Sequence, residues 1–166
     1  MRDSQAIVLQ AGEGRGKILK IFGDEVTVKC STTDTGGWYS ILEDTTKPQC
    51  GPPLHRHLCE DESFYVLEGE YLFEIDGERV YAGPGASVYA PRGSAHTFQN
   101  VGESKGRMLV MVQPGGLDRF FRELDAATAG MRKPDPTVVL PVFEKYKIEL
   151  LGPPLPVQEG VASAAD

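Results

Sequence analysis

The sequence has no run of about 18 uncharged apolar residues, which is the length that a membrane-spanning helix needs. Residues 1–16 also contain no apolar segment of the length found in signal peptides. These two absences argue against insertion in a membrane and against secretion. We therefore expect a soluble protein of the cytoplasm.

Positive charge is also scarce. The chain has 17 Lys and Arg residues against 24 Asp and Glu residues, a formal net charge of −7 and a pI of about 5.0. Such a protein repels nucleic-acid phosphates and anionic lipid surfaces. The charge balance therefore indicates neither a nucleic acid nor a membrane as a partner.

Cysteine is rare, with only Cys30, Cys50 and Cys59 in the chain. An odd number of thiols cannot pair completely within one chain, and a reducing compartment keeps them free, so we predict no disulfide framework. Cys59 precedes two acidic residues, whereas a reactive thiol needs cationic neighbours. We interpret Cys59 as an inert loop thiol.

Glycine and proline, by contrast, are frequent. The 19 glycines and 12 prolines are scattered among short apolar runs, a pattern typical of many short strands joined by turns. A chain of 166 residues that is 40% hydrophobic can bury one core and not comfortably two. The composition therefore predicts one all-β domain.

Nine segments that are rich in β-branched and aromatic residues have the length and composition of strands. They are residues 17–22, 26–30, 38–43, 63–67, 71–75, 78–82, 87–90, 97–101 and 107–112. The Asp76-Gly77 pair between two of them is typical of a type I′ hairpin turn. The even spacing of the segments predicts a sandwich or a barrel, which hides the edges of its sheets.

Beyond residue 113 the apolar residues follow a helical period. Leu117, Phe120, Phe121 and Leu124 fall at i, i+3, i+4 and i+7, which predicts an amphipathic helix packed on the barrel. As a hypothesis, this helix also caps the mouth of a pocket in the barrel.

Less regular segments complete the chain. Asp135-Pro136 has the form of an N-cap followed by the first helical residue, so we predict a second short helix in spite of Pro141. Residues 148–151 are a predicted edge strand. Residues 152–166 are rich in proline and alanine without an apolar period, which is typical of a disordered tail.

The three histidines of the chain are His55, His57 and His96. On a strand, residues two apart project from one face with Cα atoms roughly 6.6 Å apart, so the first two imidazoles can reach one ion. The turn before His96 can return a later strand to this pair, and the acidic residues 60–62 can add a carboxylate. Such ligands suit one divalent ion of Fe, Mn, Ni, Co, Cu or Zn better than Mg or Ca.

The histidines lie in two motifs that resemble those of the cupin superfamily. The motifs are His55-x-His57-x4-Glu62-x6-Gly69 and Gly85-x5-Pro91-x-Gly93-x2-His96-x3-Asn100. The first motif departs from the family pattern at its start, where Gln49 stands in place of a glycine. Residues 115–121 and 150–154 also resemble the C-terminal extension of small single-domain cupins that are described as quercetin-dioxygenase-like.

This resemblance implies a double-stranded β-helix, the cupin jelly-roll barrel, over residues 17–112. An N-terminal arm would occupy residues 1–16, and a C-terminal helical extension with one or two short helices would occupy residues 113–151. Within the arm, residues 7–9 are strand-like and resemble the segment by which small cupins pair. A homodimer is therefore predicted.

The resemblance also implies that His55, His57, Glu62 and His96 are the metal ligands. The motif spacing favours Glu62 over its two acidic neighbours. In quercetinase-like cupins the glutamate is both a ligand and a general base, and Glu62 is accordingly the catalytic candidate.

Strand parity indicates which side chains surround this site. Glu62 and Phe64 share one face of their strand, as do His96 and Phe98. We predict Phe64, Phe73 and Phe98 as the walls of a substrate pocket. Arg56 lies between two ligands but points to the opposite face, where we expect an ion pair.

The likeness to quercetinase-like cupins favours a dioxygenase that acts on a flavonol or another small, enolisable aromatic molecule. Two alternatives remain open, because one barrel supports many chemistries. The first is a redox-neutral isomerase, cyclase or lyase that uses the same ion. The second is a non-catalytic cupin that binds a small molecule; regulators of this kind commonly carry a DNA-binding helix-turn-helix, which this sequence lacks.

Overall fold

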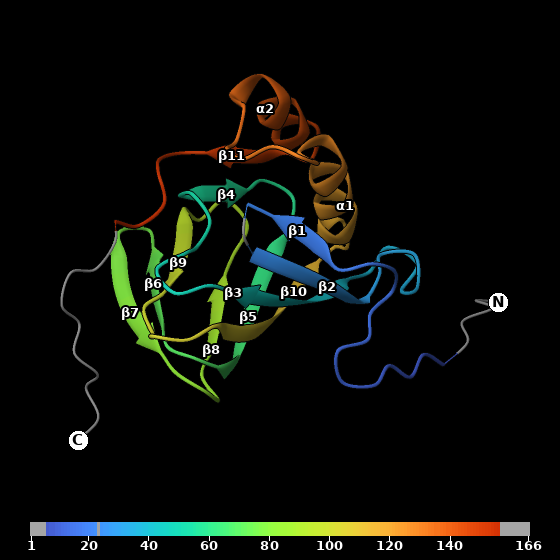
Figure 1. Ribbon diagram of the computed structural model, residues 1–166, viewed down its shortest axis with the longest axis horizontal. Helices are drawn as coiled ribbons and strands as arrows, with labels where there is room; N and C mark the ends of the chain where they lie inside the picture. The colour runs from blue at the N-terminus through green and yellow to red at the C-terminus, as the bar shows by residue number, and fades with distance from the viewer. Residues whose placement is uncertain (1–5, 23, 157–166) are drawn as a thin grey trace.

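Two antiparallel β-sheets face each other in the computed structural model, which describes residues 6–22 and 24–156 (Figure 1). One sheet has six strands in the order β1-β2-β3-β10-β5-β8, and the other has five in the order β11-β4-β9-β6-β7. Two short helices follow the barrel strands near the C-terminus. The predicted fold class is therefore confirmed.

The six-stranded sheet consists of β1 (Leu19–Ile21), β2 (Asp24–Cys30), β3 (Ser40–Thr46), β10 (Gly106–Gln113), β5 (Asp61–Glu68) and β8 (Ser87–Ala90). The five-stranded sheet consists of β11 (Ile148–Leu150), β4 (His55–His57), β9 (His96–Asn100), β6 (Tyr71–Ile75) and β7 (Glu78–Ala82). Neighbouring strands pair antiparallel throughout.

The core lies between the two sheets and follows from alternation along the strands. On β10, Met108, Val110 and Val112 are buried, and the residues between them are more exposed. Phe64 and Val66 are buried in the same alternation on β5. Because side chains of a strand alternate between its two faces, these residues all point toward the opposite sheet.

The strands β6, β7 and β8 have the bounds predicted from the sequence. The turn between β6 and β7 explains this agreement. Asp76 and Gly77 have φ angles of 49° and 86°, and a type I′ turn requires positive φ at both central residues. This turn therefore limits both strands at the predicted residues.

The strand predicted at residues 38–43 differs from β3, which begins at Ser40 and continues to Thr46. The Thr35 hydroxyl donates a hydrogen bond to the Tyr39 carbonyl (2.6 Å) and accepts one from the Tyr39 N–H (3.2 Å). These bonds extend the preceding turn as far as Tyr39. Trp38 consequently lies outside the strand and is 61% exposed.

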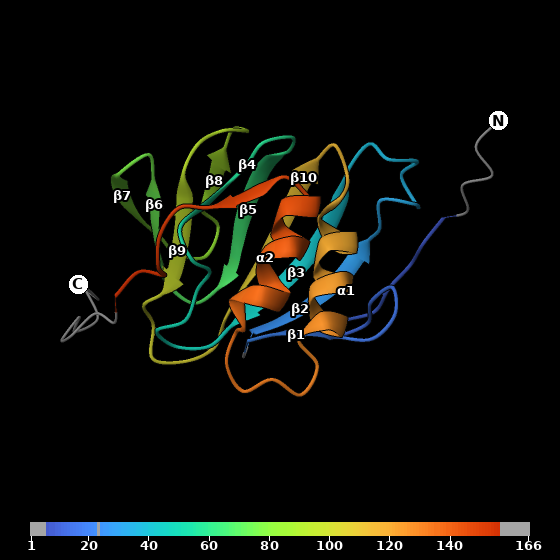
Figure 2. The same ribbon diagram turned by 90° about the horizontal axis from the view of Figure 1, so that it is seen from above.

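The helices α1 (Leu117–Ala127) and α2 (Pro136–Lys145) lie side by side across one open side of the sandwich (Figure 2). The first packs on β1 and β3, and the second packs on β11. They therefore bridge the edge strands of the two sheets. Within the described part of the chain, no helix has the length and apolar character needed to cross a membrane.

Both helices begin as their sequences predict. The apolar stripe of α1 is buried, and the Asp135 side chain caps α2 by accepting a hydrogen bond from the Thr137 N–H (2.9 Å). Pro141 lies inside α2 without ending it. The burial of Val139 and Val142 against the rest of the fold explains this, because tertiary packing overrides a poor local propensity.

The two ends of the chain are less regular. Residues 7–9 form no strand in this structure, and Val8 is 79% exposed. Residues 152–156 have no helix or strand. The remainder of the predicted arm, residues 1–5, and of the predicted tail, residues 157–166, falls outside the described residues.

Candidate metal centre

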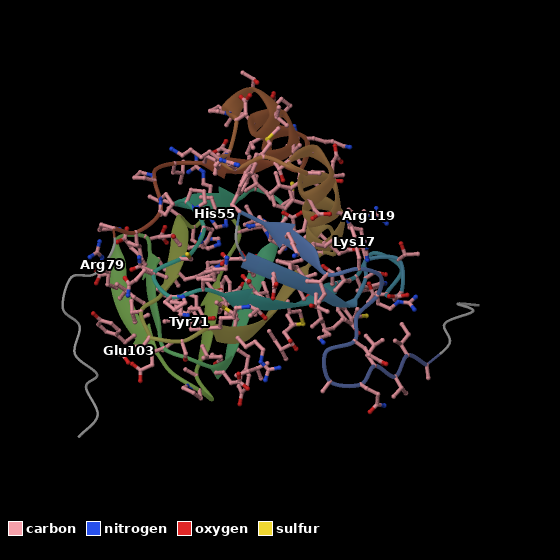
Figure 3. All side chains as sticks on the ribbon, viewed as in Figure 1. Lys17, His55, Tyr71, Arg79, Glu103 and Arg119 are labelled. Atoms are coloured by element: carbon pink, nitrogen blue, oxygen red, sulfur yellow. The ribbon has the colours of Figure 1, made fainter. Side chains whose placement is uncertain are left out.

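Three strands bring the predicted ligands together. His55 and His57 lie on β4, and His96 on β9 pairs directly with His55. Glu62 reaches them from β5 in the facing sheet. One donor atom of each residue lies within 4.8 Å of the donor atoms of the other three. Figure 3 labels His55, on the strand between β11 and β9.

The Glu62 carboxylate is at the centre of this cluster. Its Oε2 atom lies 2.9 Å from His96 Nε2 and 3.3 Å from His57 Nε2. Glu62, His57 and His96 are only 5%, 3% and 2% exposed. Burial of a carboxylate among imidazoles is costly unless the charges are compensated, and a bound cation would compensate them.

The outer nitrogens of two of the imidazoles, His55 and His96, have hydrogen-bond partners that fix the rings. His55 Nδ1 lies 2.8 Å from the Pro53 carbonyl oxygen, and His96 Nδ1 lies 3.1 Å from the carbonyl oxygen of Ser94. A carbonyl oxygen only accepts hydrogen bonds, so both Nδ1 atoms carry the proton and the Nε2 lone pairs face inward. His57 Nδ1 lies 3.5 Å from Glu60 Oε2, which favours the same tautomer.

Electrostatics favour the protonation state of a metal ligand at His55 and Glu62 but oppose it at His57. Burial, together with the neighbouring imidazoles, lowers the pKa of His55 to about 3. Burial works to raise the pKa of Glu62, but the charges and hydrogen bonds of the histidines outweigh it and lower this pKa to about 2. Burial works to lower the pKa of His57, and the Glu62 and Glu60 carboxylates outweigh it and raise this pKa.

The donor set fits a divalent transition metal. Three imidazole nitrogens and one carboxylate oxygen converge, and His55 and His96 hydrogen-bond through their second ring nitrogen, as metal-bound histidines typically do. Fe, Mn, Ni, Co, Cu and Zn all accept such ligands. The residues therefore form a candidate metal site, in which the identity of the metal is open.

Comparison with known proteins agrees with this geometry. Residues 43–112 match the family described as "Cupin domain". The chain has the cupin fold. A search of curated proteins found no match.

Solved structures give the same result for the barrel. A predicted oxalate decarboxylase from Thermotoga maritima superposes with a TM-score of 0.58 and 21% identity, over 66% of this chain and 99% of that chain. An RmlC-like cupin from Shewanella frigidimarina superposes with a TM-score of 0.56 and 18% identity, over 70% of this chain and 98% of that chain. KdgF from Halomonas sp. superposes with a TM-score of 0.53 and 20% identity, over 58% of this chain and 85% of that chain. These likenesses show the cupin fold, and the finer likeness to quercetinase-like proteins stays a prediction.

The cupin barrel is hollow beside the ligands. A cavity of about 550 Å³ is lined by His55, His57 and Glu62, together with many apolar side chains. Phe120 and Leu124 of α1 also line it. The helix predicted to cap a pocket therefore forms part of the cavity wall.

The three predicted aromatic walls differ in their position. Phe64 and Phe98 line the cavity, whereas Phe73 does not and is 1% exposed. The Phe73 ring packs against those of Phe64 (5.2 Å between centroids) and Phe98 (5.6 Å). These two rings stand between Phe73 and the cavity. The prediction that Phe73 is a wall of the pocket is therefore wrong, and Phe73 instead supports the two rings that form the wall.

Two further carboxyl groups line the cavity and were missed from the sequence: Asp24 and Asp44. Burial raises the pKa of Asp24 to about 6. Burial and the charges of Asp24 and Glu62 raise the pKa of Asp44 well above its ordinary value. The predicted strand stopped at residue 43; extended to residue 46, it would have placed Asp44 on the inward face with Leu42.

The remaining residues near the ligands lie as expected. Arg56 points away from the cavity, and its Nε donates a 2.6 Å hydrogen bond to Glu149 on β11. Cys59 is exposed and is not among the residues that line the cavity.

Proposed function

We propose that this cupin is a metal-dependent dioxygenase that acts on a flavonol-like or other enolisable aromatic compound. One divalent transition metal would be held by His55, His57, Glu62 and His96. The observation that carries the proposal is that the ligand cluster opens onto a largely apolar cavity of about 550 Å³. This volume falls within the range of roughly 300–1,000 Å³ that is typical of small-molecule sites.

The chain supplies binding and orientation. Phe64 and Phe98 offer apolar surfaces to an aromatic ring, and the hydrogen-bonded outer nitrogens hold two of the imidazoles in place. When bound, a redox-active ion with these four ligands would leave up to two coordination positions for a chelating substrate and dioxygen.

Glu62 is proposed both as a ligand and as the base that removes the enol proton. The deprotonated substrate would then react with dioxygen and lose carbon monoxide. The pKa of Glu62 is about 2, so the carboxylate is ionised, which suits metal coordination. An efficient general base instead has a pKa nearer the working pH. The base role therefore rests on the likeness to quercetinase-like cupins, and it needs its own test.

Oxygen uptake by metal-loaded protein tests both parts of the proposal. We expect the wild type to consume oxygen with a flavonol such as quercetin. Glu62→Gln keeps an oxygen donor and removes the basicity, so metal content should persist while turnover falls by about 10²–10⁴-fold. Glu68→Gln, an exposed position on the same strand, should match the wild type.

The two ways in which this test can fail are distinct. A metal-loaded Glu62→Gln variant that consumes oxygen at the wild-type rate would show that Glu62 is not the base. If the metal-loaded wild type consumed no oxygen with any member of a panel of enolisable aromatic compounds, the dioxygenase proposal would be wrong. Redox-neutral chemistry on a carbonyl group would then be the function to test at this site.

A further inference from the structure

The cavity contains a polar group that the metal site does not use, the carboxyl group of Asp44. In the sheet, Asp44 on β3 pairs with Val26 of β2 and with Met108 of β10. It shares the inward face of β3 with Leu42, and both side chains line the cavity. Asp44 therefore belongs to the same internal space as the metal ligands.

Asp44 and Glu62 lie at different levels of that space. Along β10, Met108 pairs with Asp44 and Val112 pairs with Glu62, four residues further on. With the rise per residue of a β-strand, four residues separate these two backbone levels by roughly 13 Å. The side chains that line the cavity between them are apolar: Leu42, Phe64 and Val110. The cavity thus has two polar ends separated by an apolar middle.

The Asp44 carboxyl group lacks a complete set of partners. Its Oδ1 atom is buried and has no hydrogen-bond partner within the described chain. Buried polar atoms in native proteins are nearly always paired, because an unpaired one loses its hydration without compensation. Among the described residues that line the cavity, none is Lys or Arg. The Thr46 hydroxyl lies near Asp44 and acts to lower its pKa, but it forms no hydrogen bond with Oδ1, so a molecule in the cavity can be the partner of this oxygen.

The charge around Asp44 indicates the chemistry of that molecule. Burial and the negative charges of Asp24 and Glu62 raise the pKa of Asp44 well above its ordinary value, which favours its protonated form. A protonated carboxyl group both donates and accepts hydrogen bonds, as a hydroxyl group does. An anionic group would instead face three acidic residues in a cavity that no described Lys or Arg lines, although Lys47 lies near Asp24.

We propose that Asp44 determines substrate specificity by hydrogen bonding to a phenolic hydroxyl group at the end of the substrate remote from the metal site. The inference rests on the proposed function, because the metal site determines where the chelating end of the substrate lies. Asp44 selects an aromatic compound with a hydroxyl group on its remote ring over the same ring system without one.

Two flavonols separate this role from general binding. Quercetin and 3-hydroxyflavone share the 3-hydroxy-4-keto chelating group, and quercetin alone has hydroxyl groups on its other rings. Their affinities for metal-loaded protein are measured by titration without oxygen, so that turnover does not contribute. The wild type should bind quercetin more tightly. Asp44→Leu should weaken quercetin binding by about tenfold and leave 3-hydroxyflavone binding unchanged.

Two variants serve as controls. Asp44→Asn keeps a hydrogen-bonding side chain of the same size and should retain most of the preference for quercetin. Thr45→Leu, at the next position on β3 but on its opposite face, should bind both flavonols as the wild type does. Equal metal content and equal circular dichroism spectra show that each variant is folded.

The outcomes distinguish this inference from the proposed function. If Asp44→Leu weakens the binding of both flavonols equally, or changes the binding of neither, the proposed role of Asp44 is wrong. Failure of both flavonols to bind the metal-loaded wild type overturns it as well. If the preference for quercetin depends on Asp44 while no oxygen is consumed, the dioxygenase proposal fails and the inference about Asp44 stands.

Discussion

The interior of the barrel has a filled end and a hollow end. Toward the filled end, aromatic rings pack between β5, β6 and β9, with centroids 5.2 Å apart for Phe64 and Phe73 and 5.9 Å for Tyr71 and Phe98; Phe64 and Phe98 also line the cavity. At the hollow end, the cavity of about 550 Å³ lies beside the candidate metal ligands. Figure 3 labels Tyr71 and His55, which lie toward these two ends. One region is thus a packed core, and the other leaves room for a ligand.

The difference arises from how far the strands pair. The strand β6 pairs with β9 through five residues, from Tyr71 with Asn100 at the filled end to Ile75 with the candidate ligand His96 at the hollow end. At the hollow end, β4 has three residues and pairs with β9 only where His55 meets His96. The short strand leaves a gap that side chains of the sheets do not fill. We therefore expect the filled end to govern stability and the hollow end to govern binding.

The largest effect on stability is expected at the filled end. Phe73→Ala removes a fully buried ring that contacts two others, and such truncations cost about 3–5 kcal/mol of unfolding free energy. Metal content of the folded variant should not change. Denaturant unfolding combined with elemental analysis checks both expectations. Tyr81→Ala, at a side chain that is 63% exposed on β7, is the control and should change the unfolding free energy little. A loss of metal in the folded Phe73→Ala variant would contradict the expectation that the filled end governs stability and the hollow end governs binding.

Substitution of a candidate ligand at the hollow end should remove the metal and, with it, only the stabilisation that metal binding provides. His57→Ala removes one of four donors, so metal content should fall from one ion per chain to nearly none. The stabilisation that metal gives the wild type, about 2.7 kcal/mol at a free concentration of one hundred times Kd, should disappear with it. Thermal unfolding with and without added metal measures this loss. Arg56→Ala, on the same strand but facing outward, should retain the ion. Full metal content in His57→Ala would rule out the site.

The smallest effect concerns Asp24 and depends on pH. Because burial raises its pKa from 3.8 to about 6, the native state binds this proton more tightly than the unfolded state. The contribution of Asp24 to wild-type stability should therefore fall as the pH rises from about 4 to 6. Asp24→Asn should be more stable than the wild type by about 1–2 kcal/mol above pH 6, and equal to it below pH 4.

A control of opposite sign is available for this pH dependence. Hydrogen bonds from Ser31 and the charge of Arg15 lower the pKa of Asp34. Asp34→Asn should therefore be less stable than the wild type at neutral pH, and this difference should vanish in acid. Thermal unfolding across the pH range measures both variants. An Asp24→Asn variant less stable than the wild type at pH 7 would contradict the assignment of a carboxyl group whose pKa is raised by burial.

The sequence was most informative where one local rule determined the outcome. The Asp76-Gly77 turn limits β6 and β7, and the i, i+2 histidines project from one face of β4, because both features depend on a few consecutive residues. The grouping of His96 with the first pair was predicted correctly because two complete motifs carried the long-range information. The use of this cluster to bind metal stays a prediction.

The cavity could not be predicted in this way. Its volume depends on how two helices, two sheets and several loops meet, which no local pattern encodes. Phe73 and Phe98 are direct partners across β6 and β9, yet only Phe98 reaches the cavity. Asp44 was missed because the Thr35 turn shifts β3 by two or three residues from the predicted segment, so the end of that strand was not considered.

The helices have a consequence for how this protein can diversify. Residues 43–112 match the cupin domain and contain all four candidate ligands, whereas α1 and α2 lie beyond that segment and contribute to the cavity wall. Substitutions in α1 and α2 can reshape the cavity without changing a single donor atom. The two helices and the candidate ligands are thus separable parts of one protein, and exchanging residues of the helices can change one part of the cavity wall while the ligands and Asp44 stay in place.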